Sequence, residues 1–157
     1  MSESFRTHLR FSEEAWELAQ EMVKRDRFRS MGDLTAAALR LLRHLLDLQK
    51  EGYELVFNRD SEIRLFDLGL GEVIESKDYS QKKYSQDHTV QLIFLGEAFK
   101  RFTELQDLSR IYDDATLVRK SLHIYETVRC AVLDGWRLCR RKNGKIEWIR
   151  LAILKSP

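Results

Sequence analysis

Residues 5–11 read FRTHLRF, and apolar and polar side chains alternate along this stretch. Alternation with a period of two is typical of a strand that buries one face and exposes the other. Leu9 and Phe11 would point inward together with Phe5. The outward side chains would then be Arg6, His8 and Arg10.

Two helices and a hairpin are predicted after this strand. SEEAWELAQEMVKRD begins with Ser12, a good N-cap residue, followed by two glutamates that favour the positive end of a helix. Ser30 with Asp33 indicates the start of a second, longer helix with a wide leucine stripe. Gly52 is placed where a left-handed residue ends a helix. GYELVFNRDSEIRLFDL then indicates a hairpin that turns at residues 58–61.

The chain contains an internal sequence repeat. Residues 9–68 align with 92–151 without a gap, and 12 of the 60 pairs are identical. We call the constant difference in numbering between aligned positions the repeat offset, and aligned residues counterparts. The apolar positions of the first copy also recur in the second, through several elements in succession. Examples are Leu9/Leu92, Trp16/Phe99, Leu34/Leu117, Leu45/Val128 and Tyr53/Trp136. This agreement predicts an internal duplication.

The second copy shows the same order of patterns. HTVQLIF (88–94) is predicted as a strand, a helix follows, and a longer helix runs from the N-cap Asp113 to Gly135. The last hairpin contains Asn143–Gly144, the strongest short-range hairpin signal. We therefore expect an α+β protein with repeats at 1–68 and 88–157, and a polar linker at 69–87.

The repeated unit resembles the ribbon-helix-helix family of prokaryotic DNA-binding proteins. The residues that carry the resemblance are THLRF, SEEAWELA and RSMGDL in the first copy, and VQLIF, GEAFKRF and DDATLV in the second. The resemblance implies tandem ribbon-helix-helix repeats with hairpin extensions, whose strands pair as a two-stranded antiparallel ribbon. Pairing within one chain, as a pseudo-dimer, and exchange between two chains of a homodimer both remain open.

The resemblance also implies a function. Paired strands of this family enter the major groove of double-stranded DNA, where outward side chains read base edges. The expected base contacts are Arg6, His8 and Arg10, joined by Thr89 and Gln91 of the second strand. The outward position after these two is Ile93, so the two strands differ and an asymmetric DNA site is expected.

Phosphate contacts are expected at the N-terminus of the second helix, where backbone N–H groups bind anions. The residues concerned are Arg29, Ser30, Met31 and Gly32. The equivalent stretch of the second copy contains Asp113 and Asp114, which would repel a phosphate. A basic hairpin tip is a further candidate for phosphate contact: Arg140, Arg141 and Lys142.

Composition and motifs narrow the function classes. No apolar run is long enough for a membrane span, and the N-terminus lacks a signal pattern, so a cytoplasmic protein is expected. Two cysteines and four histidines show no metal-ligand spacing, and no catalytic or cofactor motif is present. We expect neither an enzyme nor a cofactor.

Two functions remain. The first is a sequence-specific DNA-binding protein, such as a bacterial or phage transcriptional regulator or accessory factor. Because the net charge is only +2, its DNA-binding surface would have to be local. The alternative is a protein-interaction module on the same scaffold, antitoxin-like or a complex subunit, with partly lost DNA binding. Ile93, Asp113 and Asp114 favour this alternative.

Overall fold

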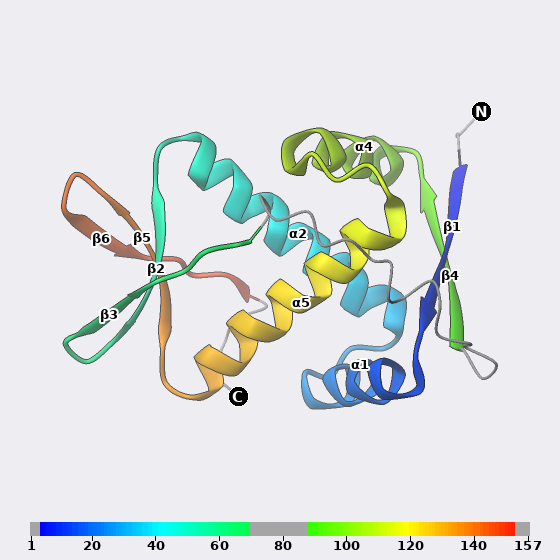
Figure 1. Cartoon of the computed structure of the whole chain (residues 1–157), viewed down its shortest axis with the longest axis horizontal. Helices are drawn as coiled ribbons and strands as arrows, with labels where there is room; N and C mark the ends of the chain where they lie inside the picture. Colours follow the sequence, from blue (N-terminus) through cyan, green and yellow to red (C-terminus); the bar gives the residue numbers. More distant parts are fainter. Residues whose placement is uncertain (1–3, 70–87, 153–157) are drawn as a thin grey trace. The chain divides into compact units, whose positions relative to one another are not determined.

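The computed structural model describes residues 4–69 and 88–152 (Figure 1). Within these ranges it contains helices and two small antiparallel sheets, which confirms the α+β class. The predicted linker at 69–87 lies outside the described residues, except for Gly69.

The same five elements occur twice along the described chain. The first copy forms β1 (Ser4–Phe11), α1 (Glu13–Arg25), α2 (Met31–Lys50), β2 (Glu54–Arg59) and β3 (Glu62–Leu65). The second forms β4 (His88–Leu95), α4 (Glu97–Ser109), α5 (Asp114–Leu133), β5 (Arg137–Lys142) and β6 (Lys145–Trp148). From α2 onward, each element of the second copy begins at the counterpart of the residue that begins its equivalent, as the sequence alignment predicts.

Unusual backbone conformations recur at the same offset. Arg27 and Arg110 both have φ of 60°, and the helix-ending glycines Gly52 and Gly135 have φ of 96° and 94°. Asp60 and Asn143 open the two hairpin turns with φ of 55° and 54°. Left-handed residues are rare outside glycine, so their coincidence supports the duplication at the level of the backbone.

The chain divides into two compact units, and each unit draws on both copies. Unit 1 comprises residues 1–35 and 69–118, and unit 2 comprises residues 36–68 and 119–157. Both long helices continue from one unit into the other, since α2 spans 31–50 and α5 spans 114–133. The predicted boundaries at 68 and 88 therefore describe the sequence repeat rather than these units.

Unit 1 is organised around a two-stranded ribbon. β1 pairs antiparallel with β4 of the same chain, and His8 lies opposite Gln91. These two residues are counterparts in the two copies, so the local twofold relation between the copies passes through this central pair. Helices α1 and α4 lie on one side of the ribbon (Figure 1). The first turns of α2 and α5 belong to the same unit and point toward the ribbon.

Local sequence signals set the starts of α1 and α5 as predicted. Ser12 Oγ accepts a hydrogen bond from the Ala15 N–H at 3.2 Å and caps α1. Asp113 caps α5, because its carboxylate accepts from the Thr116 N–H at 2.9 Å. Each cap satisfies an N–H group that has no partner within its helix.

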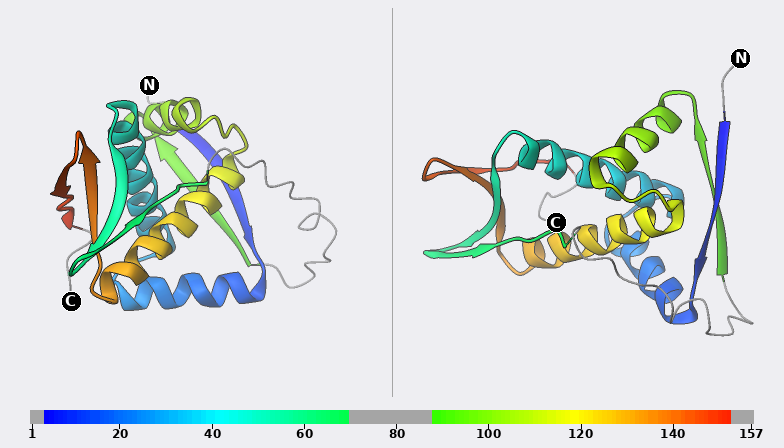
Figure 2. Two further views of the ribbon diagram at one scale, coloured as in Figure 1. Left: turned by 60° about the vertical axis from the view of Figure 1, so that its left-hand side comes forward. Right: turned by 45° about the horizontal axis from the view of Figure 1, so that its top comes forward.

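Unit 2 contains a four-stranded sheet of order β3-β2-β5-β6, with helical residues of α2 and α5 on one side (Figure 2). Val56 pairs with its counterpart Cys139, so this sheet has the same local twofold relation. The β5–β6 turn has positive φ at both Asn143 and Gly144, as a type I′ turn requires. The buried residues of unit 2 include Leu41, Leu42, Leu45, Leu55, Val56, Tyr125, Val128 and Leu138.

Neither α2 nor α5, nor the shorter helices of the described ranges, combines the length and apolar character of a membrane span.

Candidate nucleic-acid interface

The outer face of the ribbon carries the side chains predicted to contact bases. Arg6, His8 and Arg10 of β1 are exposed. Their partners across the ribbon are Ile93, Gln91 and Thr89 respectively, and these are exposed too. The ribbon therefore presents three cross-strand pairs in a row, each with one residue from either copy. Cross-strand partners share a face, so the six side chains form one surface.

Burial of the opposite face holds this surface outward. Leu9 and Leu92 are buried, with 0% and 6% of their surface exposed. Thr7 and Phe11 are buried as well. Because strand side chains alternate between faces, a shift of β1 by one residue would place its arginines in the core. The orientation of the candidate interface is thus set by apolar burial.

Aromatic clusters fasten both ends of the ribbon to the short helices. At one end, Phe94 packs on Phe102 of α4 at 4.7 Å between ring centroids, and Phe5 lies 5.2 Å from Phe99. The counterparts of Phe94, Phe99 and Phe5 are Phe11, Trp16 and His88, and these three meet at the other end.

At that second end, the His88 ring stacks on Trp16 at 4.6 Å, and Phe11 approaches Trp16 edge-on at 5.8 Å. His88 Nε2 also lies 2.8 Å from Glu13 Oε2 in the first turn of α1. Histidine here takes the place that Phe5 occupies in the other copy. The two ends therefore match at these three positions with one polar exchange, whereas Phe102 has the small Ala19 as its counterpart.

The two ends differ on the outer face. At one end Arg6 pairs with Ile93, which is 51% exposed, and Leu95 follows on the same face with 59% exposed. At the other end Arg10 pairs with Thr89. Each end thus has one arginine. The neighbours of Arg6 are apolar, whereas the cross-strand neighbour of Arg10 is polar. This outer-face asymmetry contrasts with the three matched positions of the aromatic clusters on the underside.

The N-terminus of α2 partly fits the predicted phosphate site. Ser30 Oγ accepts from the Asp33 N–H at 3.2 Å, and Met31 and Gly32 form the first turn. Arg29 Nε donates to Asp33 Oδ2 at 2.9 Å, although 90% of the Arg29 side chain is exposed. A phosphate would meet an exposed cation here, but it would also have to compete with the Asp33 carboxylate.

The N-terminus of α5 has its carboxylates engaged within the chain. Asp113 caps the helix, and its Oδ2 also accepts from the Thr116 hydroxyl at 2.6 Å. Asp114 Oδ1 accepts from the Gln106 side chain at 2.7 Å, which ties α5 to the end of α4. Both aspartates therefore have structural partners, and together they place negative charge where a phosphate would bind.

The basic hairpin tip belongs to unit 2, and its cations all have partners within that unit. Arg140 lies 3.6 Å from Glu147, and Arg141 Nε donates to Glu54 at 3.2 Å. Lys142 Nζ donates to the Glu51 carbonyl at 2.8 Å. These contacts give each cation a role within the sheet, so the predicted phosphate contact at this tip stays a prediction without added support.

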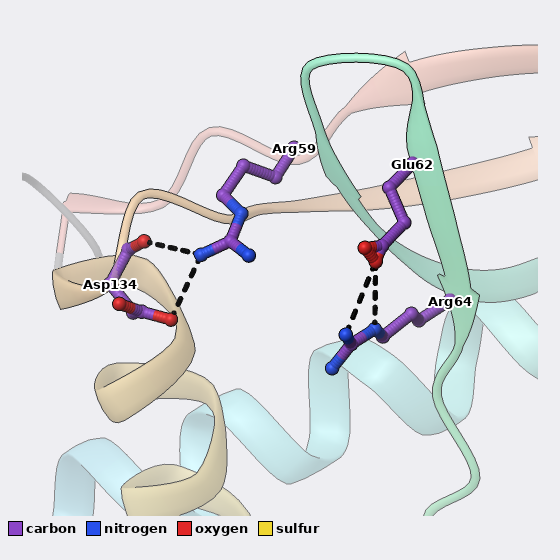
Figure 3. A network of polar contacts seen from close by, with 4 residues as sticks. All are labelled: Arg59, Glu62, Arg64 and Asp134. Atoms are coloured by element: carbon purple, nitrogen blue, oxygen red, sulfur yellow. Dashed lines mark hydrogen bonds and ion pairs between the residues drawn. The ribbon is translucent and has the colours of Figure 1, made fainter.

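Arg59 and its counterpart Lys142 make equivalent contacts in the two copies. Each links the hairpin of its own copy to the residue that follows the long helix of the other copy. Arg59 Nη1 donates to the Asp134 carbonyl at 3.2 Å and to its carboxylate at 3.0 Å (Figure 3). Its guanidinium lies 4.4 Å from the centre of the Trp136 ring, and Arg64 covers that ring at 4.6 Å. Lys142, the counterpart of Arg59, lies 4.9 Å from the Tyr53 ring.

The outer face of the ribbon includes Leu95, which the sequence prediction did not place there. Leu95 extends β4 by one residue beyond the predicted strand at 88–94, and it joins the outer face. The sequence could have placed Leu95 on this face, because it lies two residues after Ile93 and residues two apart on a strand share a face. The predicted contacts of β1 and β4 meet on one surface of unit 1, whereas residues 140–142 belong to unit 2.

Unit 2 also contains a cavity of about 720 Å³ near Trp136 and Trp148. Its lining combines these rings with aliphatic side chains, Arg137 and Arg150. Carboxylate, imidazole and thiol groups do not line it among the described residues. This part of the chain likewise contains no cluster of three or more histidine, cysteine or acidic residues that could hold a metal ion.

Comparisons with protein-family models, with curated proteins and with solved structures found no match for the chain.

Proposed function

We propose that the chain is a sequence-specific double-stranded DNA-binding protein of ribbon-helix-helix type, which reads the major groove with the β1–β4 ribbon. The observation that carries this proposal is the outer face of the ribbon. Arg6, His8 and Arg10 stand in one exposed row opposite Thr89, Gln91 and Ile93. A two-stranded ribbon fits the major groove, and arginine binds guanine through two hydrogen bonds.

The tandem arrangement supports the same proposal. A single strand with two helices leaves its edge and its apolar stripe open, whereas two copies complete one another. The register centred on His8 and Gln91 is that of such a pair within one chain. Phosphate binding would occur at the first turn of α2, beside Arg29. A transcriptional regulator or accessory DNA-binding factor of bacterial or phage origin fits this arrangement.

The test is selection of bound duplexes from a random pool, followed by mobility shifts at two salt concentrations. Arg6→Ala combined with Arg10→Ala removes two expected guanine contacts. Each such contact contributes about 1–3 kcal/mol of discrimination, so specific affinity should fall between about 30-fold and about 10⁴-fold. The circular dichroism spectrum should not change, because both side chains are exposed.

A matched control removes two positive charges elsewhere. Arg40 and Lys50 are exposed on α2 within unit 2, and Arg40→Ala with Lys50→Ala should leave specific affinity within a few-fold of the parent. Equal losses in both double variants would show that only net charge matters. Undiminished binding by the ribbon variant would refute the ribbon proposal.

A protein-interaction module is the second candidate, and a feature of unit 2 favours it. Leu65, Val56, Cys139 and Trp148 form one row across the sheet. The outer members Leu65 and Trp148 are 67% and 46% exposed. Val56 and Cys139 between them are buried, so Leu65 and Trp148 are two separate exposed apolar groups at the edges of the sheet, where a partner protein would pack. Absence of DNA affinity at low salt, together with a stoichiometric protein partner, would favour this candidate over DNA binding.

A further inference from the structure

One end of the ribbon exposes two apolar side chains that guanine recognition does not use. Ile93 and Leu95 are 51% and 59% exposed, and they lie two residues apart on the outer face of β4. Their spacing along the strand is about 7 Å, which is close to two base-pair steps of DNA. Arg6 is the cross-strand partner of Ile93.

The fold does not require an apolar group at this position. The underside of the ribbon supplies the buried contacts, through Leu9, Leu92 and the aromatic clusters. The counterpart of Ile93 in the first copy is Arg10, and that side chain is exposed as well. The same structural position thus holds a cation in one copy and a branched hydrocarbon in the other.

We propose that Ile93, with Leu95 beside it, recognises the 5-methyl groups of thymine at this end of the DNA site. This inference rests on the proposed function and names part of its specificity. The preferred site is then asymmetric: a guanine read by Arg6 is flanked by thymine at one end. At the other end, Arg10 reads guanine next to the polar Thr89.

The chemistry of the groove selects this ligand. The thymine methyl is the apolar group that the base pairs present in the major groove, and aliphatic side chains contact it. The other members of the outer face are arginine, histidine, glutamine and threonine, which suit base edges. A protein partner needs about 800 Å² on each side, far more than two side chains at the end of a two-stranded ribbon provide. Thymine therefore fits the neighbours of Ile93 better than a protein surface does.

The expected size of the effect follows from the methyl group itself. Removing one buried methyl group from an apolar contact corresponds to about a four-fold change in affinity, which is about 0.8 kcal/mol at 1.4 kcal/mol per ten-fold. If Leu95 contacts a second thymine, its position should show an effect of similar or smaller size.

The experiment replaces single thymines with deoxyuridine, which removes only the methyl group. A duplex selected from the random pool is synthesised with one such replacement at a time, and the dissociation constant is measured for the full chain. One or two thymines on one side of the site should show a loss of about four-fold. In Ile93→Ala the loss at the principal position should disappear, so that thymine and deoxyuridine duplexes bind equally.

Two further variants make the result specific. Ile93→Val keeps a branched apolar side chain, so it should retain most of the preference for thymine. Leu18→Ala removes another exposed apolar side chain, 48% exposed on α1, and it should leave the preference unchanged. Circular dichroism of each variant checks that the fold is intact.

The outcomes separate this inference from the proposed function. Specific binding without any methyl dependence overturns the role of Ile93 but leaves DNA recognition in place. A methyl dependence that persists in Ile93→Ala also overturns it. If no specific duplex emerges from the pool, the proposed function and this inference both fail.

Discussion

The aromatic cluster under the Arg6 end of the ribbon provides a direct test of how the ribbon is held. Phe102 of α4 is 4% exposed, and its ring lies 4.7 Å from Phe94 and 6.3 Å from Phe5. Phe102→Ala removes a buried ring that contacts both strands. Truncation of a buried phenylalanine costs about 3–5 kcal/mol, because transfer free energy is lost and a cavity is left.

Urea denaturation followed by circular dichroism measures this loss. With a slope of about 2 kcal/mol per molar, the midpoint should fall by about 1.5–2.5 M. Leu18→Ala is the matched control, since this α1 side chain is 48% exposed, and its effect should stay within about 0.5 kcal/mol. A midpoint shift in Phe102→Ala as small as that of the control would refute the conclusion that this cluster anchors the ribbon.

The remaining predictions concern unit 2. Arg59→Ala should lower the free energy of unfolding by about 1 kcal/mol, because a partly exposed ion pair with Asp134 and a stack on Trp136 are lost together. Urea denaturation checks this, and an unchanged midpoint would contradict a stabilising role for these two contacts. Cys130 is exposed, whereas burial raises the pKa of the Cys139 thiol above its ordinary value of 9.0. Iodoacetamide should therefore alkylate Cys130 first in the folded protein, as mass spectrometry can show, and equal rates at the two thiols would contradict the burial. The raised pKa means that the folded state holds the proton of the Cys139 thiol more tightly than the unfolded state does. The free energy of unfolding should therefore keep its value below about pH 9 and decline at higher pH.

Much of unit 1 follows from short-range signals in the sequence. Alternation along residues 5–11 predicts which side chains are buried, and the structure buries Leu9 while it exposes Arg6 and Arg10. Ser12 and Asp113 cap helices as predicted, because an N-cap depends on residues only three positions apart. The predicted strands at 5–11 and 88–94 are also the two that pair antiparallel, although the sequence left open whether they pair within one chain.

Contacts between residues far apart in the chain could not be predicted in this way. No local sequence signal explains why an aspartate stands at position 114. In the structure its carboxylate accepts a hydrogen bond from the Gln106 side chain. The charges at 140–142 look available for phosphate, yet Arg141 binds Glu54 and Lys142 reaches the Glu51 carbonyl. Such pairs depend on sheet register and hairpin direction, which no local pattern encodes.

The amino-acid sequence alone determined the repeat, the strand phase and the helix starts, because periodicity and capping act over a few residues. Tertiary structure decided which outward side chains become neighbours. The pairing of Arg6 with Ile93 and of Arg10 with Thr89 comes from the register of β1 against β4. That register depends on burying Leu9 and Leu92 together on the far side of the ribbon, so packing of the underside selects the chemistry presented on the outer face.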